Sequence, residues 1–253
     1  MNPAEFSNIA AAERSFWWYR GMREILFDTL DRLTPGRGIS RVLETGCGTG
    51  ATALDLTESY GWQVIGLDAS PIAMQWLRSR GLRALQGDIS RLPVAAACCD
   101  AVVSCDVLPH LAAGEEAAAF SECARVIRPG GLLILRVAAF KWLRSRHSIF
   151  VGERQRFTRS LILELARASG FQPLRCTYLN CLALPGAWAK FRLIEPLFNS
   201  QPASGVGAMP AWLDWLLLSA LRAERAWLKR GHNLPIGQSI LLIAERLPDS
   251  RPS

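Results

Sequence analysis

The chain has 253 residues, of which half are hydrophobic and 20% are charged. This length predicts one large domain or one domain with an elaboration, and the hydrophobic fraction excludes a disordered chain. No run of about 18 uninterrupted hydrophobic residues occurs, and residues 1–16 lack the hydrophobic region of a signal peptide. We therefore expect neither a membrane-spanning helix nor a secretory leader.

The predicted elements alternate along the chain between helices and strands. Residues 1–40 favour helix, and a helix that Ser70 can cap begins at Pro71. Further helices are expected over 160–169 and 211–230, a turn at 128–131 and a loop over 201–210. Strands are expected at 41–44, 63–68, 83–86, 100–105, 132–137, 174–179 and 239–245. This alternation predicts an α/β fold whose doubly wound, mostly parallel sheet is covered by helices on both faces.

The net charge of +7 suggests an anionic partner. The positive charge is not spread evenly along the chain, so only part of the protein would contact such a partner. Residues 41–137 carry eight Lys or Arg against ten Asp or Glu, whereas residues 138–253 carry sixteen against seven. The surplus therefore lies in the C-terminal half. Because no RNA-binding motif accompanies it, the sequence does not favour a nucleic acid partner.

The seven cysteines are scattered and include no C-x-x-C pair, and the three histidines do not stand at metal-ligand spacing. We therefore predict no metal site and no disulfide framework, which fits a reducing cytoplasm.

The most informative segment is a glycine-rich turn that follows the first predicted strand. It reads Glu44-Thr45-Gly46-Cys47-Gly48-Thr49-Gly50 and leads into a helix. Such a turn lets the backbone approach a ligand, and the helix N-terminus offers unpaired N–H groups. The spacing Gly46-x-Gly48-x-x-Ala51 also satisfies the dinucleotide-binding fingerprint, so an NAD-linked oxidoreductase of the same fold stays open at this point.

An acidic residue ends each of the first three strands and separates these alternatives. Glu44, Asp68 and Asp88 should lie along one crevice at the carboxyl ends of the strands. Asp68 is placed to accept hydrogen bonds from ribose hydroxyls. Glu44, beside the glycines, suits a ligand with an ammonium group and would repel a pyrophosphate. The pattern favours S-adenosylmethionine over NAD.

Residues 41–137 resemble the class I S-adenosylmethionine-dependent methyltransferases, close to the methyltransferase type 11 and ubiquinone/menaquinone-biosynthesis group. The resemblance is carried by residues 44–50, Gly66-Leu67-Asp68-Ala69-Ser70, Gly87-Asp88-Ile89, Asp100 to Leu111, and Arg125-Val126-Ile127-Arg128-Pro129-Gly130-Gly131. It implies a Rossmann-like, seven-stranded, mostly parallel sheet with an antiparallel last strand. It also implies S-adenosyl-L-methionine as cofactor and S-adenosyl-L-homocysteine as product.

The resemblance implies roles for particular residues. The methionine portion of the cofactor would be held by Glu44, Thr45, Gly46, Cys47, Gly48 and Gly50. The ribose would lie at Asp68 and Ala69, and the adenine at Asp88 and Ile89. Ser104 and Cys105 would lie beside the methionine end. Where the family commonly has a glutamate after the fourth strand, this chain has Pro109, which leaves His110 as the candidate base, with Tyr19 second.

Substrate choice must come from the flanks, which hold seven of the nine tryptophans. The candidate pocket residues are Trp18, Tyr19, Arg23, His147 and Trp215. The apolar first half of the helix over 211–230 fits a lid over a hydrophobic substrate, a peripheral membrane contact or a dimer interface.

We predict a cytoplasmic methyltransferase that acts on a small hydrophobic or aromatic acceptor by in-line displacement; a non-catalytic membrane- or partner-binding module is the other alternative. The single expected domain comprises an N-terminal helical cap (1–40), a cofactor-binding core (41–179), a helical lid-like insertion (180–238), and a last strand and tail (239–253).

Overall fold

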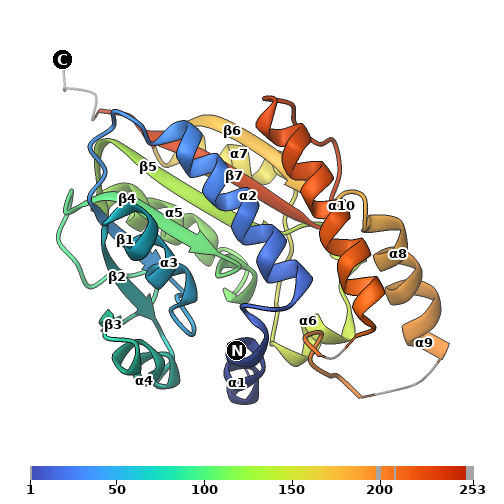
Figure 1. Ribbon diagram of the computed structural model, residues 1–253. Helices are drawn as coiled ribbons and strands as arrows, with labels where there is room; N and C mark the ends of the chain where they lie inside the picture. Colours follow the sequence, from blue (N-terminus) through green and yellow to red (C-terminus); the bar gives the residue numbers. More distant parts are fainter. Residues whose placement is uncertain (1, 198–200, 208, 249–253) are drawn as a thin grey trace.

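The computed structural model describes residues 2–197, 201–207 and 209–248, and it shows a seven-stranded sheet at its centre (Figure 1). The strand order is β3-β2-β1-β4-β5-β7-β6. The strands are β1 (Arg41–Thr45), β2 (Gln63–Asp68), β3 (Arg83–Gln86), β4 (Cys99–Cys105), β5 (Ile127–Ala138), β6 (Phe171–Leu179) and β7 (Ser239–Arg246). β1 to β5 pair in parallel, while β7 runs antiparallel to both β5 and β6. The predicted fold class is confirmed.

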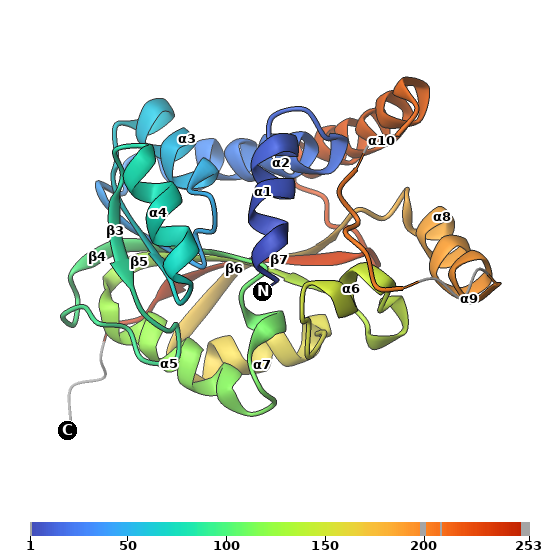
Figure 2. The same cartoon turned by 90° about the horizontal axis from the view of Figure 1, so that it is seen from below.

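Helices cover both faces of the sheet (Figure 2). One face carries α2 (Trp17–Leu33), α3 (Ala51–Tyr60), α4 (Pro71–Ser79) and α10 (Ala211–Lys229), and the other carries α5 (Glu115–Val126) and α7 (Arg159–Ala168). The first turn of α4 is capped as predicted, because the Ser70 hydroxyl accepts a hydrogen bond from the Ile72 backbone N–H at 3.2 Å. α1 (Pro3–Ala12) precedes α2, so the N-terminal helical segment is two helices.

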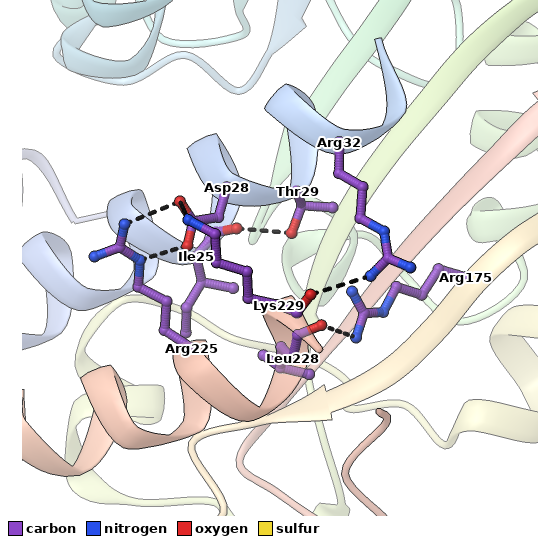
Figure 3. A pocket seen from close by; sticks show the side chains of 8 residues that line it. All are labelled: Ile25, Asp28, Thr29, Arg32, Arg175, Arg225, Leu228 and Lys229. Carbon is purple, nitrogen blue, oxygen red and sulfur yellow. Dashed lines mark hydrogen bonds and ion pairs between the residues drawn. The ribbon is translucent and has the colours of Figure 1, made fainter. Parts of the chain in front are cut away.

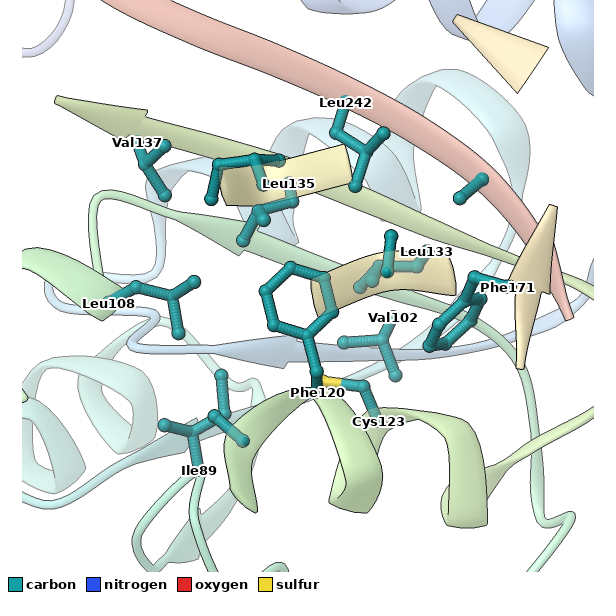
Figure 4. Close-up of a cluster of buried hydrophobic side chains, with 14 of the residues drawn as sticks. Ile89, Val102, Leu108, Phe120, Cys123, Leu133, Leu135, Val137, Phe171 and Leu242 are labelled. Carbon is teal, nitrogen blue, oxygen red and sulfur yellow. The ribbon is translucent and has the colours of Figure 1, made fainter. Parts of the chain in front are cut away.

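Alternation along β5 divides the core into two layers. Leu133, Leu135 and Val137 face α5 and α7 and pack with Phe120 (Figure 4). Leu132 and Ile134 point the other way, toward α2, α3 and α10. This period of two is what a central strand buried on both faces requires. Full burial of a side chain such as Phe120 contributes about 1.5–3 kcal/mol.

The start of β5 differs from the sequence-based expectation. Residues 128–131 were expected to form a turn, but the strand already begins at Ile127, which pairs with Cys99 across a local irregularity of register. A Cβ at Gly131 would lie 2.6 Å from the backbone oxygen of Asp100. The glycine there permits close strand approach and does not form the predicted turn.

Between β6 and β7 the chain forms a helical insertion. It contains α8 (Leu184–Ala189), a π-helical turn over Lys190–Ile194, α9 (Glu195–Leu197) and α10. Between β4 and α5 lies a short 3₁₀ turn (Leu108–His110); after β5 come a second such turn (Lys141–Leu143) and α6 (Arg146–Phe150). Of the predicted loop over 201–210, residue 208 lies outside the described residues, as does the predicted tail over 249–253.

Ion pairs fasten α10 to α2. Arg225 meets the Asp28 carboxylate at 2.6 Å and Lys229 meets it at 3.6 Å (Figure 3), while Arg222 meets Glu24 at 2.8 Å. Acids of α2 therefore neutralise most of the basic side chains in the second half of α10. Each such half-exposed pair contributes at most about 1 kcal/mol, but together they fix the orientation of α10 on the sheet.

Candidate functional site

A large cavity lies at the carboxyl ends of β1, β2, β4 and β5. Its volume is about 1400 Å³, and its wall is built from those strand ends, the N-terminal helices, α6, the α8–α9 segment and the start of α10. Small-molecule sites commonly measure about 300–1,000 Å³. This cavity therefore has room for two ligands side by side.

Three glycines in left-handed conformation shape the loop along one wall, and two of them, Gly46 and Gly48, line the cavity. Gly46, Gly48 and Gly50 have φ of 63°, 54° and 79°. A Cβ at Gly46 would collide with Val107, and one at Gly50 with Leu77. No described atom lies within 4 Å of the position a Gly48 Cβ would take, although Gly48 lines the cavity. The backbone at Gly48 is thus the place where a ligand can approach the loop closely.

Glu44 lies at the end of β1 beneath these glycines. Its side chain is buried, and its Oε2 has no hydrogen-bond partner among the described residues. Burial raises the pKa of Glu44 to about 8, against the opposing effect of hydrogen bonding from Thr52 and the backbone of Ala53. An unpaired buried carboxyl at a cavity wall is suited to a cationic group of a ligand.

Asp68 and Asp88 follow the next two strands, and both line the cavity. The Asp68 Oδ1 accepts from the Ser70 N–H at 2.8 Å, and its Oδ2 accepts from the Gly48 N–H at 3.0 Å. These bonds fix the carboxylate and tie the glycine loop to β2. Each oxygen keeps a lone pair for a ligand hydroxyl. The Asp88 Oδ1 accepts from both the N–H and the hydroxyl of Ser90 at 2.7 Å.

Nine of the twelve residues predicted to bind the cofactor line the cavity: Glu44, Gly46, Cys47, Gly48, Asp68, Ala69, Asp88, Ile89 and Cys105. Thr45, Gly50 and Ser104 do not. Thr45 and Ser104 have fully buried side chains whose hydroxyls find no partner among the described residues. Gly50 packs against Leu77 and Leu82. These three lie behind the cavity wall.

The N-terminal segment closes over the glycine loop. The buried Glu13 carboxylate accepts from the Thr49 hydroxyl at 2.5 Å and pairs with Arg80 at 2.5 Å. Nearby, Arg14 and Arg23 both pair with Asp55 of α3, at 2.5 and 3.3 Å. Arg23 is thereby directed to α3 and is absent from the cavity lining, contrary to its predicted place in the substrate pocket.

A half-buried charge pair faces the cavity at the ends of β4 and β5. Arg136 stands beside Cys105 in the strand register, and its Nη2 meets the Asp106 carboxylate at 2.6 Å. The Trp18 ring covers its guanidinium at 4.7 Å. Although burial disfavours the charge, Asp106 raises the pKa of Arg136 above its usual range. Asp106 has φ of 60°, a left-handed conformation found at functional sites.

Asp106 and Arg136 are not among the site residues predicted from the sequence. The signal that could have found Arg136 is a charged residue within the otherwise apolar strand 132–137. Its Nη1 makes no hydrogen bond to any described residue, so the guanidinium keeps a donor for a ligand.

Tyr19 and His110, the two candidate bases, both line the cavity. Burial and the nearby carboxylates of Glu5 and Asp106 raise the pKa of Tyr19 well above its usual value. Its phenol stays protonated at neutral pH and can donate a hydrogen bond, which argues against its predicted role as a base. Burial lowers the pKa of His110, and its Nδ1 lies 3.4 Å from the Gly152 oxygen. A neutral imidazole that donates from Nδ1 keeps the Nε2 lone pair.

Two further predicted pocket residues have different positions. His147 lines the cavity, where its Nδ1 accepts from the Gly205 N–H at 2.8 Å. Trp215 points outward and is 68% exposed, so its predicted place in the pocket is wrong. Leu213 and Leu217, on the neighbouring face of α10, line the cavity instead.

The arrangement fits S-adenosylmethionine. The unpaired Glu44 Oε2 matches an amino group, the open backbone at Gly48 matches close approach of a ligand, and the Asp68 carboxylate matches ribose hydroxyls. A doubly wound sheet with an antiparallel last strand and this crevice defines the Rossmann-like class I methyltransferase fold.

Proteins with similar sequences support this assignment of the fold and the cofactor. Residues 43–135 match the family model described as a methyltransferase domain. The chain is 36% identical over 126 residues to a protein of Mycolicibacterium smegmatis named a probable S-adenosylmethionine-dependent methyltransferase, covering 49% of this chain and 46% of that one. It is 30% identical over 164 residues to the malonyl-[acyl-carrier protein] O-methyltransferase of Herminiimonas arsenicoxydans, covering 62% of each.

Among solved structures, a chain of the complex between the Haloferax volcanii Trm112 methyltransferase activator and its methyltransferase has the same fold. Its TM-score is 0.64 at 19% identity, covering 98% of this chain and 97% of that one. The chain spans about half the length of the first two relatives it matches. Residues 43–135 thus match the methyltransferase-domain family that the motifs predicted, and the relative in Mycolicibacterium smegmatis is named as S-adenosylmethionine-dependent. Across the part of the chain that the structure describes, no helix has the length and apolar character needed to cross a bilayer.

Proposed function

We propose that the protein transfers a methyl group from S-adenosylmethionine to a small hydrophobic or aromatic acceptor. The observation that carries this proposal is the buried, unpartnered Glu44 carboxyl beside the open Gly48 backbone, in a cavity with room for a second ligand. The pyrophosphate of NAD offers the Glu44 carboxyl no cationic partner, whereas the amino group of S-adenosylmethionine does, and this favours methyl transfer over the alternative NAD-linked reaction.

On the cofactor side, Glu44 would pair with the amino group and Asp68 with the ribose hydroxyls. Asp88 and Ile89 would receive the adenine, and Cys105 would lie near the methionine end. When bound, the cofactor supplies a methyl carbon activated by a positive sulfonium. The protein then contributes alignment of the acceptor and exclusion of water.

On the acceptor side, apolar and aromatic side chains dominate the wall: Trp17, Trp18, Phe191, Ile194, Met209, Leu213 and Leu217. This lining supports an acceptor with a hydrophobic or aromatic body. The donor at Arg136 Nη1 and the carboxylate of Asp106 would orient a polar group on it. Asp106 and the neutral His110 are the groups placed to take a proton from the acceptor.

The cofactor assignment can be tested by calorimetry with S-adenosylhomocysteine. We expect binding by the wild type and at least about tenfold weaker binding by Asp68→Ala, because a charge-assisted hydrogen bond is lost. Asp31→Ala is the matched control, since Asp31 contacts Tyr60 outside the cavity. Binding of NAD but not of S-adenosylhomocysteine would refute the proposal. We further propose that the protein acts in the cytoplasm.

A further inference from the structure

An apolar rim surrounds the outer side of the insertion. It comprises the exposed side chains of Trp142, Ile149, Leu182, Trp188, Leu193, Ile194, Leu197, Trp212, Trp215 and Leu216. Leu197 is 79% exposed, and Trp212 and Trp215 are 66% and 68% exposed. Of the fourteen large hydrophobic side chains that are exposed among the described residues, ten thus fall within the three segments 142–149, 182–197 and 212–216. Such a concentration marks an interaction surface.

The rim is continuous with the cavity. On α10, Leu213 and Leu217 line the cavity while Trp212 and Trp215 face outward. The α8–α9 segment repeats this arrangement, with Ala187 lining the cavity and Leu193 exposed. Both helical segments lie on the same side of the molecule in two perpendicular views (Figures 1 and 2). Ile194 belongs to both surfaces, since it is exposed and also lines the cavity, so the rim and the cavity meet at this residue.

The rim also carries positive charge that the protein does not neutralise. Its segments 141–151, 182–197 and 211–217 contain the bases Lys141, Arg144, Arg146, Lys190 and Arg192 and the acids Glu195 and Asp214. Neither acid pairs with one of these bases: the Glu195 carboxylate accepts from the Arg146 backbone N–H at 3.0 Å, and Asp214 accepts from the Trp17 N–H at 2.9 Å and pairs with Arg20 at 3.8 Å. Among the described residues no carboxylate pairs with Lys141, Lys190 or Arg192. Tryptophan beside unpaired cations is the composition of a membrane-surface contact.

We propose that this rim docks the protein on an anionic lipid bilayer and that the acceptor enters the cavity from that bilayer. The part concerning the acceptor rests on the proposed methyl transfer, whereas the docking does not. α10 would lie at the headgroup level with Trp212 and Trp215 inserted, while its basic half stays clamped to α2.

The test is flotation of the full chain with vesicles. Wild type should bind vesicles of phosphatidylcholine and phosphatidylglycerol in equal parts, and more weakly those of phosphatidylcholine alone. Trp212→Ala/Trp215→Ala should weaken binding about tenfold. Lys190→Glu/Arg192→Glu should remove the preference for the anionic vesicles. Leu174→Ala/Leu247→Ala, which alters exposed side chains on β6 and just beyond β7, is the control and should bind like the wild type.

Three outcomes would refute docking on a bilayer. No flotation of wild type with either vesicle, or equal flotation of the tryptophan variant, would overturn the proposal. So would a wild-type dimer, measured by analytical ultracentrifugation, that dissociates in the tryptophan variant, because the rim would then bind a second copy. Calorimetry with S-adenosylhomocysteine on the same preparations separates failure of docking from failure of the proposed function.

Discussion

The ionisation of Glu44 gives the most demanding test of the site. Its pKa is about 8 in the folded protein, because burial disfavours the charged form, against an ordinary value of 4.5. A raised carboxyl pKa means that the folded state holds a proton which the unfolded state has lost. This contribution to stability is fully present below about pH 4.5 and is lost as pH rises through about 8. Glu44→Gln keeps the shape of the protonated form and removes the ionisation.

The magnitude follows from the difference in pKa. One unit corresponds to about 1.36 kcal/mol, so full ionisation of Glu44 reduces the free energy of unfolding by about 5 kcal/mol. At pH 6 the reduction is about 2 kcal/mol, since only the unfolded state has ionised. We expect Glu44→Gln to be more stable than wild type, by a margin that widens by about 3 kcal/mol between pH 6 and pH 9.

Urea unfolding of both proteins across this pH range measures the margin. Saturating S-adenosylhomocysteine should stabilise the wild type more than the variant, because the ligand ammonium pairs with the ionised carboxylate. Glu122→Gln is a control, because it should change the pH dependence of the free energy of unfolding in the opposite direction. Hydrogen bonding from Arg125 lowers the pKa of Glu122, so the wild type should be the more stable protein at pH 8 and lose that advantage in acid. Parallel stability curves for wild type and Glu44→Gln would refute the reasoning.

Three further predictions follow from the same geometry. Gly48→Ala should lower the melting temperature no more than Gly61→Ala, which has a similar positive φ and equally open surroundings, yet calorimetry should show that only Gly48→Ala loses cofactor binding. Asp106→Asn should cost about 2 kcal/mol in urea unfolding, because it leaves the half-buried Arg136 guanidinium without its carboxylate partner; an unchanged free energy of unfolding would contradict this. Gly21→Ala should lower thermal stability, since its Cβ would overlap a leucine of α10, and an unchanged melting temperature would count against tight packing of the two helices.

The strands and the cofactor side of the site were predictable because their signals are local. Glycines stand near the ends of β1, β2 and β3 and mark their limits, and an acid at a strand end is carried to the crevice by the topology itself. The position of Asp68 at the crevice could be predicted from its place at the end of β2, without reference to any distant residue. The onset of β5 was missed because Pro129-Gly130-Gly131 has turn composition, while the pairing of Ile127 with Cys99 is a tertiary fact.

The acceptor side was less predictable because distant partners decide which way its side chains point. Arg23 is directed away from the cavity by Asp55, a residue 32 positions further on. The first half of α10 is apolar on nearly every face, so periodicity could not distinguish Trp215, which is exposed, from Leu213, which lines the cavity. Asp106 and Arg136 lie 30 residues apart and meet only because β4 and β5 are neighbours.

The ion pairs between α2 and α10 join two helices that both line the cavity but come from opposite ends of the chain. Glu24 and Asp28 come before the first strand, and the cations that neutralise them come after the sixth. Under the proposed function, acceptor preference would therefore depend on both helices. A chimera that imports the insertion from another methyltransferase without its own first helices would leave Glu24 and Asp28 unpaired and α10 unanchored. We therefore expect a chimera to keep this anchoring only if both segments are exchanged together.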